Sequence, residues 1–145
     1  MNQSENEMNK KLMLILATLG LTACGTTEEL PNPSAAQEQA AWEAYEDLRD
    51  GQYQDFLQHL TPELQQHFAS NEKMMRKFSH SIPKVESKSK TLMKKQMDDT
   101  AGQTQQYKVS YEIAYPKNLV QYDVSFDKAA GSTQIHNFNI RVFGE

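Results

Sequence analysis

The chain has 145 residues, of which 38% are hydrophobic and 23% are charged, and its formal net charge is −4 at pH 7. This length is enough for one domain of ordinary size with a single core. The mild acidity, with basic residues scattered rather than clustered, gives no electrostatic surface for nucleic acid, so we expect no nucleic-acid partner.

The first 23 residues have the parts of an export signal in the usual order. Lys10 and Lys11 give a positive start, the apolar run LMLILATL follows over Leu12–Leu19, and small residues precede Cys24. The apolar run is far shorter than the ~20 residues of a transmembrane helix. It therefore predicts export rather than a membrane span. Because acidic residues precede Met8, we predict that translation starts at Met8.

The stretch Leu21-Thr22-Ala23-Cys24, followed by Gly25, resembles the lipobox of bacterial lipoproteins. The resemblance implies that residues 1–23 are removed and that the thiol of Cys24 is diacylated. The partner would then be membrane lipid and the location the cell envelope. Gly25 after the cysteine resembles lipoproteins that diderm bacteria forward to the outer membrane, facing the periplasm. The alternative is a soluble protein with a buried free cysteine on an N-terminal helix.

Cys24 is the only cysteine of the chain. If lipid occupies its thiol, no disulfide, thiolate metal site or cysteine nucleophile remains. Residues 25–33 contain turn formers, two prolines and few apolar residues, so residues 24–33 are predicted as a lipidated tether. Fully extended, residues 25–33 would reach ~30 Å. Residues 34–145 are predicted as a single domain.

The first part of this domain has helical spacing. Ser34 with Gln37 predicts a capping box, and Gly51 predicts the end of that helix after Asp50. Its predicted inner stripe comprises Ala41, Trp42, Tyr45 and Leu48. A second helix is predicted over residues 53–60 and a third from Thr61-Pro62. A further turn or two follow Ser70 or Asn71, and Pro83 ends the helical part.

From about Lys84 the apolar residues recur at every second position, as in β-strands, instead of at helical spacing. We predict four strands, over residues 86–97, 104–115, 119–126 and 134–143. The short, turn-like separators join neighbouring strands, so the sheet is predicted to be an antiparallel meander, with the mixed first strand at an edge. The predicted fold class is α+β, with N-terminal helices packed on a curved four-stranded sheet.

Alternation predicts that one sheet face is apolar and the other polar. The predicted inner face comprises Tyr107, Val109, Tyr111, Ile113, Tyr115, Val120, Tyr122, Val124, Phe126, His136, Phe138, Ile140 and Val142. The carboxylates of the last three strands, Glu112, Asp123 and Asp127, have the outward parity.

The stretch AAWEAYEDLRDGQYQDFLQHLTPELQQH over Ala40–His67, followed by the meander, resembles the nuclear transport factor 2-like superfamily. It is similar, more narrowly, to small bacterial lipoproteins of that fold whose domains have no assigned function. The resemblance implies a cone, a bent sheet wrapped around helices, often with a pocket between them. It implies no particular activity, because the same cone serves isomerases, hydrolases and binding modules.

The candidate pocket residues are Tyr107, Tyr111, Tyr122 and His136, which share the inner face. A histidine there would serve as a base or as a ligand contact, or else as a core or rim residue bonded to a tyrosine. Met74 and Met75 near Phe78 would line a pocket mouth or fill the core.

No metal or cofactor is expected, because no ligand spacing, phosphate loop or nucleophile elbow occurs. The favoured function is a membrane-anchored, non-catalytic binding or structural module whose partner is an envelope protein or a small apolar ligand. The alternative is a lipoprotein enzyme of the isomerase or hydrolase type that uses His136 and the inward tyrosines.

Overall fold

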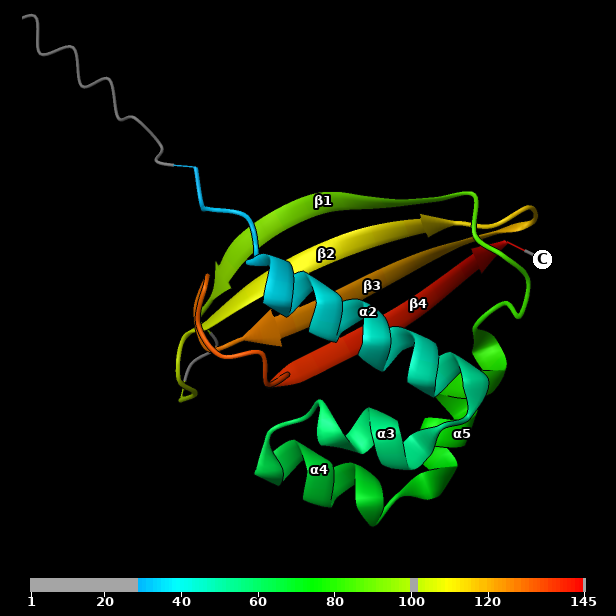
Figure 1. The fold of residues 1–145 in the computed structure, drawn as a ribbon, viewed down its shortest axis with the longest axis horizontal. Coiled ribbons are helices and arrows are strands. Elements are labelled where there is room, and N and C mark those ends of the chain that lie inside the picture. The colour runs from blue at the N-terminus through cyan, green and yellow to red at the C-terminus, as the bar shows by residue number, and fades with distance from the viewer. Residues whose placement is uncertain (1–28, 100–101, 145) are drawn as a thin grey trace, which may run out of the picture.

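The computed structural model describes residues 29–99 and 102–144. The predicted signal, Cys24 and residues 25–28 lie outside the described residues. The described part is an α+β fold in which helices precede an antiparallel sheet, as predicted (Figure 1). The elements are α2 (Ala35–Asp50), α3 (Tyr53–Gln58), α4 (Pro62–Ala69), α5 (Glu72–Ser81), β1 (Ser89–Asp98), β2 (Gln106–Ala114), β3 (Asn118–Phe126) and β4 (Asn137–Gly144).

Helix α2 begins and ends where its sequence predicts. The Gln37 backbone N–H donates to Ser34 Oγ at 3.1 Å, and the Gln37 side chain accepts from the Ser34 N–H at 3.1 Å, which completes the capping box. At the other end Gly51 has φ 77°, a left-handed conformation that glycine adopts without a Cβ penalty. Both ends of α2 are therefore specified locally.

Two of the three short helices, α3 and α5, differ in length from the prediction, whereas α4 begins at Pro62 after Thr61, as predicted. Helix α3 ends at Gln58, because Leu60 forms a bridge with Ile135 instead of continuing the helix. Helix α5 runs for ten residues, longer than the turn or two expected after Asn71. The connection to β1 is held by Lys84, whose ammonium donates to the carbonyls of Arg49 and, at 2.8 Å, Ser79.

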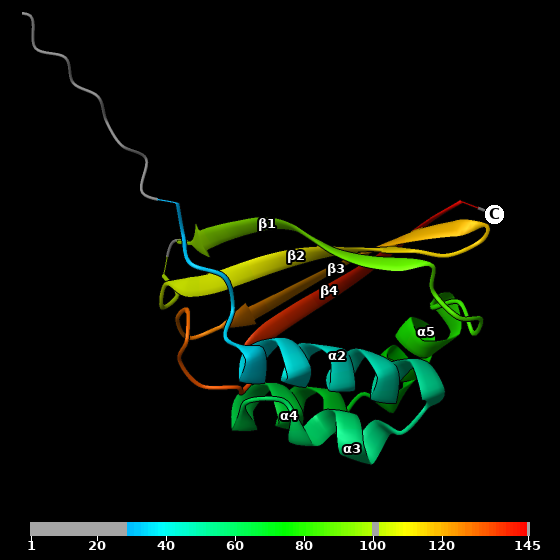
Figure 2. The ribbon, with the colours of Figure 1, turned by 45° about the horizontal axis from the view of Figure 1, so that its top comes forward.

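The sheet is the predicted meander, in the order β1-β2-β3-β4 with antiparallel neighbours. Figure 2 shows α2, α3, α4 and α5 on one side of the curved sheet. Helix α2 crosses that side with Trp42 against Tyr111 and Tyr122, at ring centroid distances of 4.6 and 6.1 Å. Phe138 of β4 packs against Phe56, Phe68 and Phe78, which come from α3, α4 and α5.

Strand β1 is an edge strand, as predicted, and it contains a bulge between Leu92 and Lys94. The extra residue shifts the alternation. Leu92 and Lys95 pair with the inward residues Tyr111 and Val109, whereas Met93 is 59% exposed. A strict period of two therefore cannot assign one face of this strand correctly on both sides of the bulge.

The start of β4 needs a correction. The prediction began this strand at Gln134 and gave His136 an inward side chain, but β4 begins at Asn137. Ile135 takes the fully buried position, since its N–H donates to His59 O at 2.8 Å and its carbonyl accepts from Thr61 N–H at 3.0 Å. His136 is only half-buried. Bonding to the α3–α4 connection thus overrides the period of the strand.

Residues 29–33, the last part of the predicted tether, lie against the domain. The Tyr107 hydroxyl donates to Pro31 O at 2.6 Å, and the Lys95 ammonium contacts Glu29 at 3.1 Å and Asn32 at 2.9 Å. Leu30 packs against the core, and Pro33 is buried. The expectation of a free tether is therefore corrected for residues 29–33, because apolar contacts and a buried tyrosine hydroxyl hold them.

Candidate functional site

The three tyrosines of the predicted pocket are core residues. Tyr107, Tyr111 and Tyr122 are each at most 2% exposed. The Tyr122 hydroxyl donates to Ala41 O at 3.0 Å, and that of Tyr107 donates to Pro31 O, so both are bonded to backbone. The Tyr111 hydroxyl has no hydrogen-bond partner among the described residues. Burial raises the pKa of the Tyr111 and Tyr122 hydroxyls, so both stay protonated at neutral pH.

His136 lies directly before β4, apart from the three tyrosine hydroxyls with which it was predicted to share a pocket. Its backbone N–H donates to Ser125 O at 2.9 Å, beside the start of β4. It borders a surface hollow that is otherwise lined by Glu63, Gly102, Gln103, Thr104, Gln106 and Asn137. None of the three tyrosines lines this hollow, so the structure does not bring His136 together with their hydroxyls there.

A larger hollow, which we call the α5–β4 groove, lies between α5 and the second half of β4. Its volume is about 750 Å³, and it is lined by Asn71, Lys73, Met74, Lys77, Phe78, Ser81, Ile140 and Val142. Met74, Phe78 and Val142 are half-buried and Ile140 is 7% exposed, so the floor is apolar. This volume falls within the roughly 300–1,000 Å³ of small-molecule sites.

The elements around the groove fix these side chains. Met74 and Phe78 are four residues apart, which puts them on one face of α5. Ile140 and Val142 alternate with outward residues on β4 and pair with Tyr122 and Val120 of β3. Phe78 also packs on Phe138 with ring centroids 5.4 Å apart. The groove therefore borders the cluster of Phe138 with Phe56, Phe68 and Phe78, which joins the helices to the sheet.

Sequence analysis identified only some of the residues that line this groove as candidate pocket residues. Met74 and Met75, near Phe78, were expected at a pocket mouth or in the core, and Met74 does border the groove. Met75, considered with it, is 2% exposed and fills the core. Lys73 and Lys77 were not singled out. Lys73 and Lys77 are four residues apart and each directly precedes one of the apolar residues Met74 and Phe78. This spacing indicates a charged rim along an apolar groove.

A family model described as a domain of unknown function (DUF4878) matches residues 23–145. The chain belongs to the DUF4878 family. No curated protein and no solved structure matches the chain. Membership of the DUF4878 family establishes a relationship over the whole domain but assigns it no activity. Any function must therefore be argued from the residues of the site.

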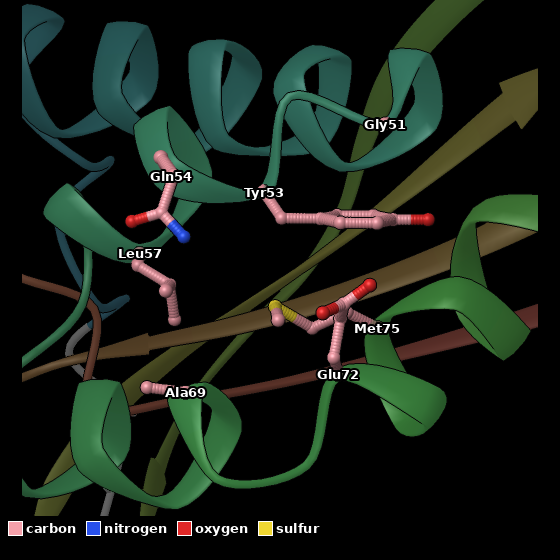
Figure 3. A pocket seen from close by; sticks show the side chains of 7 residues that line it. All are labelled: Gly51, Tyr53, Gln54, Leu57, Ala69, Glu72 and Met75. Carbon is pink, nitrogen blue, oxygen red and sulfur yellow. The ribbon is translucent and has the colours of Figure 1, made fainter.

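A smaller hollow of the DUF4878 domain, about 290 Å³, lies between α3, α4 and α5. Figure 3 shows the residues that line it, namely Gly51, Tyr53, Gln54, Leu57, Ala69, Glu72 and Met75. Leu57 and Met75 are buried, whereas Gln54 and Glu72 are exposed polar residues at its edge. With less volume and two of its apolar side chains committed to the core, this hollow is a weaker candidate for a ligand.

The outer face of the DUF4878 sheet is less polar than alternation predicts. Met93, Leu119 and Phe143 are 59%, 37% and 48% exposed and line one shallow hollow of about 260 Å³. Leu119 and Phe143 are direct cross-strand partners. This apolar patch was not predicted, because the bulge in β1 exposes Met93 and because Phe143 lies at the end of β4.

In the described part of the DUF4878 chain, no group of three or more histidine, cysteine, aspartate or glutamate side chains is arranged to hold a metal ion. Within the same residues, no helix has both the length and the apolar character needed to cross a membrane.

Proposed function

We propose that this chain is a cell-envelope lipoprotein, anchored through acylated Cys24, whose domain binds a small apolar ligand in the α5–β4 groove. The observation that carries the binding part is the apolar floor of Met74, Phe78 and Ile140 under a groove of about 750 Å³. Contact of such an apolar surface with water is unfavourable in free energy, and apolar hollows of this kind are typical of binding sites.

The anchor rests on the sequence. A charged start, a short apolar run and the Leu21–Cys24 motif precede the domain. The family match begins at residue 23, next to Cys24, so the matched region coincides with the mature chain that this motif predicts. In a diderm bacterium, Gly25 supports an outer-membrane location facing the periplasm.

The cone of the nuclear transport factor 2-like superfamily is the finer fold that we propose. The helices lie on one side of a curved antiparallel meander (Figure 2). The groove opens between a helix and an end of that sheet, which is the kind of position expected for a cone's pocket. The order of the elements, four helices and then four strands over the described residues, also agrees with the cone.

We favour binding over catalysis because the polar groups considered for catalysis do not converge. His136 borders one hollow, whereas Tyr107 and Tyr122 donate to backbone carbonyls inside the core. The groove itself is lined by two lysines, an asparagine and a serine as its polar residues. A proton-transfer enzyme needs a base within hydrogen-bond reach of its substrate, and the arrangement around His136 offers no tyrosine donor beside it.

The anchor is tested by replacing Cys24. In the native host, the wild-type chain is expected in the membrane fraction, with acyl groups on Cys24 in its mass spectrum. Cys24→Ser is expected to lack those acyl groups and to retain the uncleaved signal, because a serine hydroxyl does not replace the thiol in this modification. An unmodified Cys24 in the mature protein would contradict the anchor and leave the groove proposal standing.

The groove is tested with an uncharged fluorescent apolar probe, Nile red. The full-length chain is prepared with Cys24→Ser so that no attached acyl chain competes. Met74→Asp is expected to weaken probe binding at least tenfold, about 1.4 kcal/mol, because it puts a carboxylate on the groove floor. Met93→Asp is the matched control, since Met93 is exposed on the outer sheet face. Equal weakening by both variants, or no binding by the parent, would contradict the groove.

A further inference from the structure

Helix α5 carries unbalanced positive charge beside the groove. Its charged residues include Lys73, Arg76 and Lys77 against a single acidic residue, Glu72. Arg76 pairs with Glu72 at 2.7 Å. The side chains of Lys73 and Lys77 make no hydrogen bond or ion pair with any residue in the described ranges. The chain as a whole has a net charge of −4, so this positively charged rim is opposite in sign to the net charge of the protein.

The spacing of the two lysines favours an anion between them. Residues four apart on a helix are neighbours on its surface, and like charges at this spacing repel each other. Both lysines are exposed and both line the groove. Their aliphatic stems can cover apolar surface while the ammonium groups stay in water. An anionic group at the rim would relieve the repulsion and pair with both charges.

The floor of the groove selects against a polar occupant. Met74, Phe78, Ile140 and Val142 have side chains without N–H or O–H groups. A peptide laid on this floor would leave its own amide groups without partners there, which is unfavourable. A hydrocarbon chain has no such groups, and its burial against these side chains is favourable in proportion to the area removed from water.

We propose that the ligand of the α5–β4 groove is a single-chain lipid with an anionic headgroup. Its acyl chain lies on the floor formed by Met74, Phe78 and Ile140, and its headgroup lies beside Lys73 and Lys77. This proposal rests on the proposed binding function of the same groove. It adds the chemical class of the ligand and assigns the two lysines the role of selecting negative charge.

The test compares two probes with the same lauroyl chain, lysophosphatidylglycerol, which is anionic, and lysophosphatidylcholine, which is zwitterionic. Both are titrated below their critical micelle concentrations into the full-length Cys24→Ser chain at low salt. We expect the anionic lipid to bind at least tenfold more tightly. The Lys73→Gln/Lys77→Gln variant is expected to reduce this ratio to about threefold or less and to remove most of the salt dependence of binding. Lys88→Gln/Lys94→Gln is the matched control, since it makes the same change in net charge at exposed residues that do not line the groove, and it is expected to keep the ratio.

The outcomes separate the two proposals. If Nile red binds in the groove and the two lipids bind equally, the proposal that the groove binds apolar ligands is supported and the proposal of an anionic ligand is wrong. If the control variant loses selectivity as much as the groove variant, the effect is one of net charge and the assignment of Lys73 and Lys77 is wrong. If an acidic amphipathic peptide binds in the groove and neither lipid does, the proposal of a lipid ligand is also wrong. If no apolar probe binds at all, the proposed binding function itself fails.

Discussion

Gln37→Ala is expected to lower the free energy of unfolding by about 3 kcal/mol. Gln37 is fully buried, and its side chain makes four hydrogen bonds. Its amide donates to the carbonyls of Lys128 at 2.8 Å and Ser132 at 3.1 Å, and its oxygen accepts from the N–H groups of Ser34 and Ala130. Alanine would leave these backbone groups without their partner and detach the β3–β4 loop from α2.

The measurement is urea unfolding followed by circular dichroism. Gln39→Ala is the matched control, because Gln39 lies on the same helix and is exposed, and its side chain donates to Glu43, one turn away, at 2.7 Å rather than to the loop. We expect it to change stability by less than about 0.5 kcal/mol. Similar losses for the two variants would show that helix propensity, rather than the contacts with the loop, is responsible.

Phe138→Ala is expected to cost about 3–5 kcal/mol of stability. Phe138 is 9% exposed, and its ring lies between 5.1 and 5.4 Å from the rings of Phe56, Phe68 and Phe78. Since these three rings come from three helices, the cavity left by alanine would loosen the contact of α3, α4 and α5 with the sheet. The expected result is a large shift in the urea midpoint, together with weaker binding in the groove.

Phe143→Ala provides the comparison, because Phe143 lies on the same strand, faces the outer side and is 48% exposed. Its removal is expected to cost about 0.5 kcal/mol or less. A large loss for Phe143→Ala would mean that the outer apolar patch is covered in solution, which the structure of the single chain does not show.

The sequence predicted the helices and the sheet well where local chemistry and period agree. The Ser34–Gln37 capping box and Gly51 determine α2 with residues that are close in the chain. On β2 and β3 the strict alternation predicted the buried tyrosines and valines correctly, because no bulge interrupts these two strands and each has a neighbour on both sides.

The errors have a common physical cause, which is contact between distant segments. The bond from Ile135 to the α3–α4 connection turned the His136 side chain away from the buried position, and the bulge in β1 exposed Met93. Neither feature leaves a local signal. The role of Gln37 in holding residues 128–132 is likewise long-range, although its role in the cap was predicted.

The same limit applies to the candidate site. Periodicity identified the inner face of the sheet, but it does not show which part of that face a helix covers. Trp42 of α2 closes over Tyr111 and Tyr122, whereas α5 leaves Ile140 and Val142 beside an open groove. The predicted pocket was therefore assigned to the tyrosine-rich half of the sheet, while the accessible hollow lies at the end of β4.

The contacts of residues 29–33 with the domain set the length of the proposed membrane link. With Glu29 and Asn32 bonded to Lys95, only residues 25–28 separate the domain from Cys24. Five extended peptide steps span about 18 Å at most, so an acylated Cys24 would keep the end of the sheet near Lys95 close to the bilayer. Helix α5, which borders the groove, lies toward the opposite end of the sheet (Figure 1). A lipid held there would lie on the far side of the domain from the membrane that holds the proposed anchor.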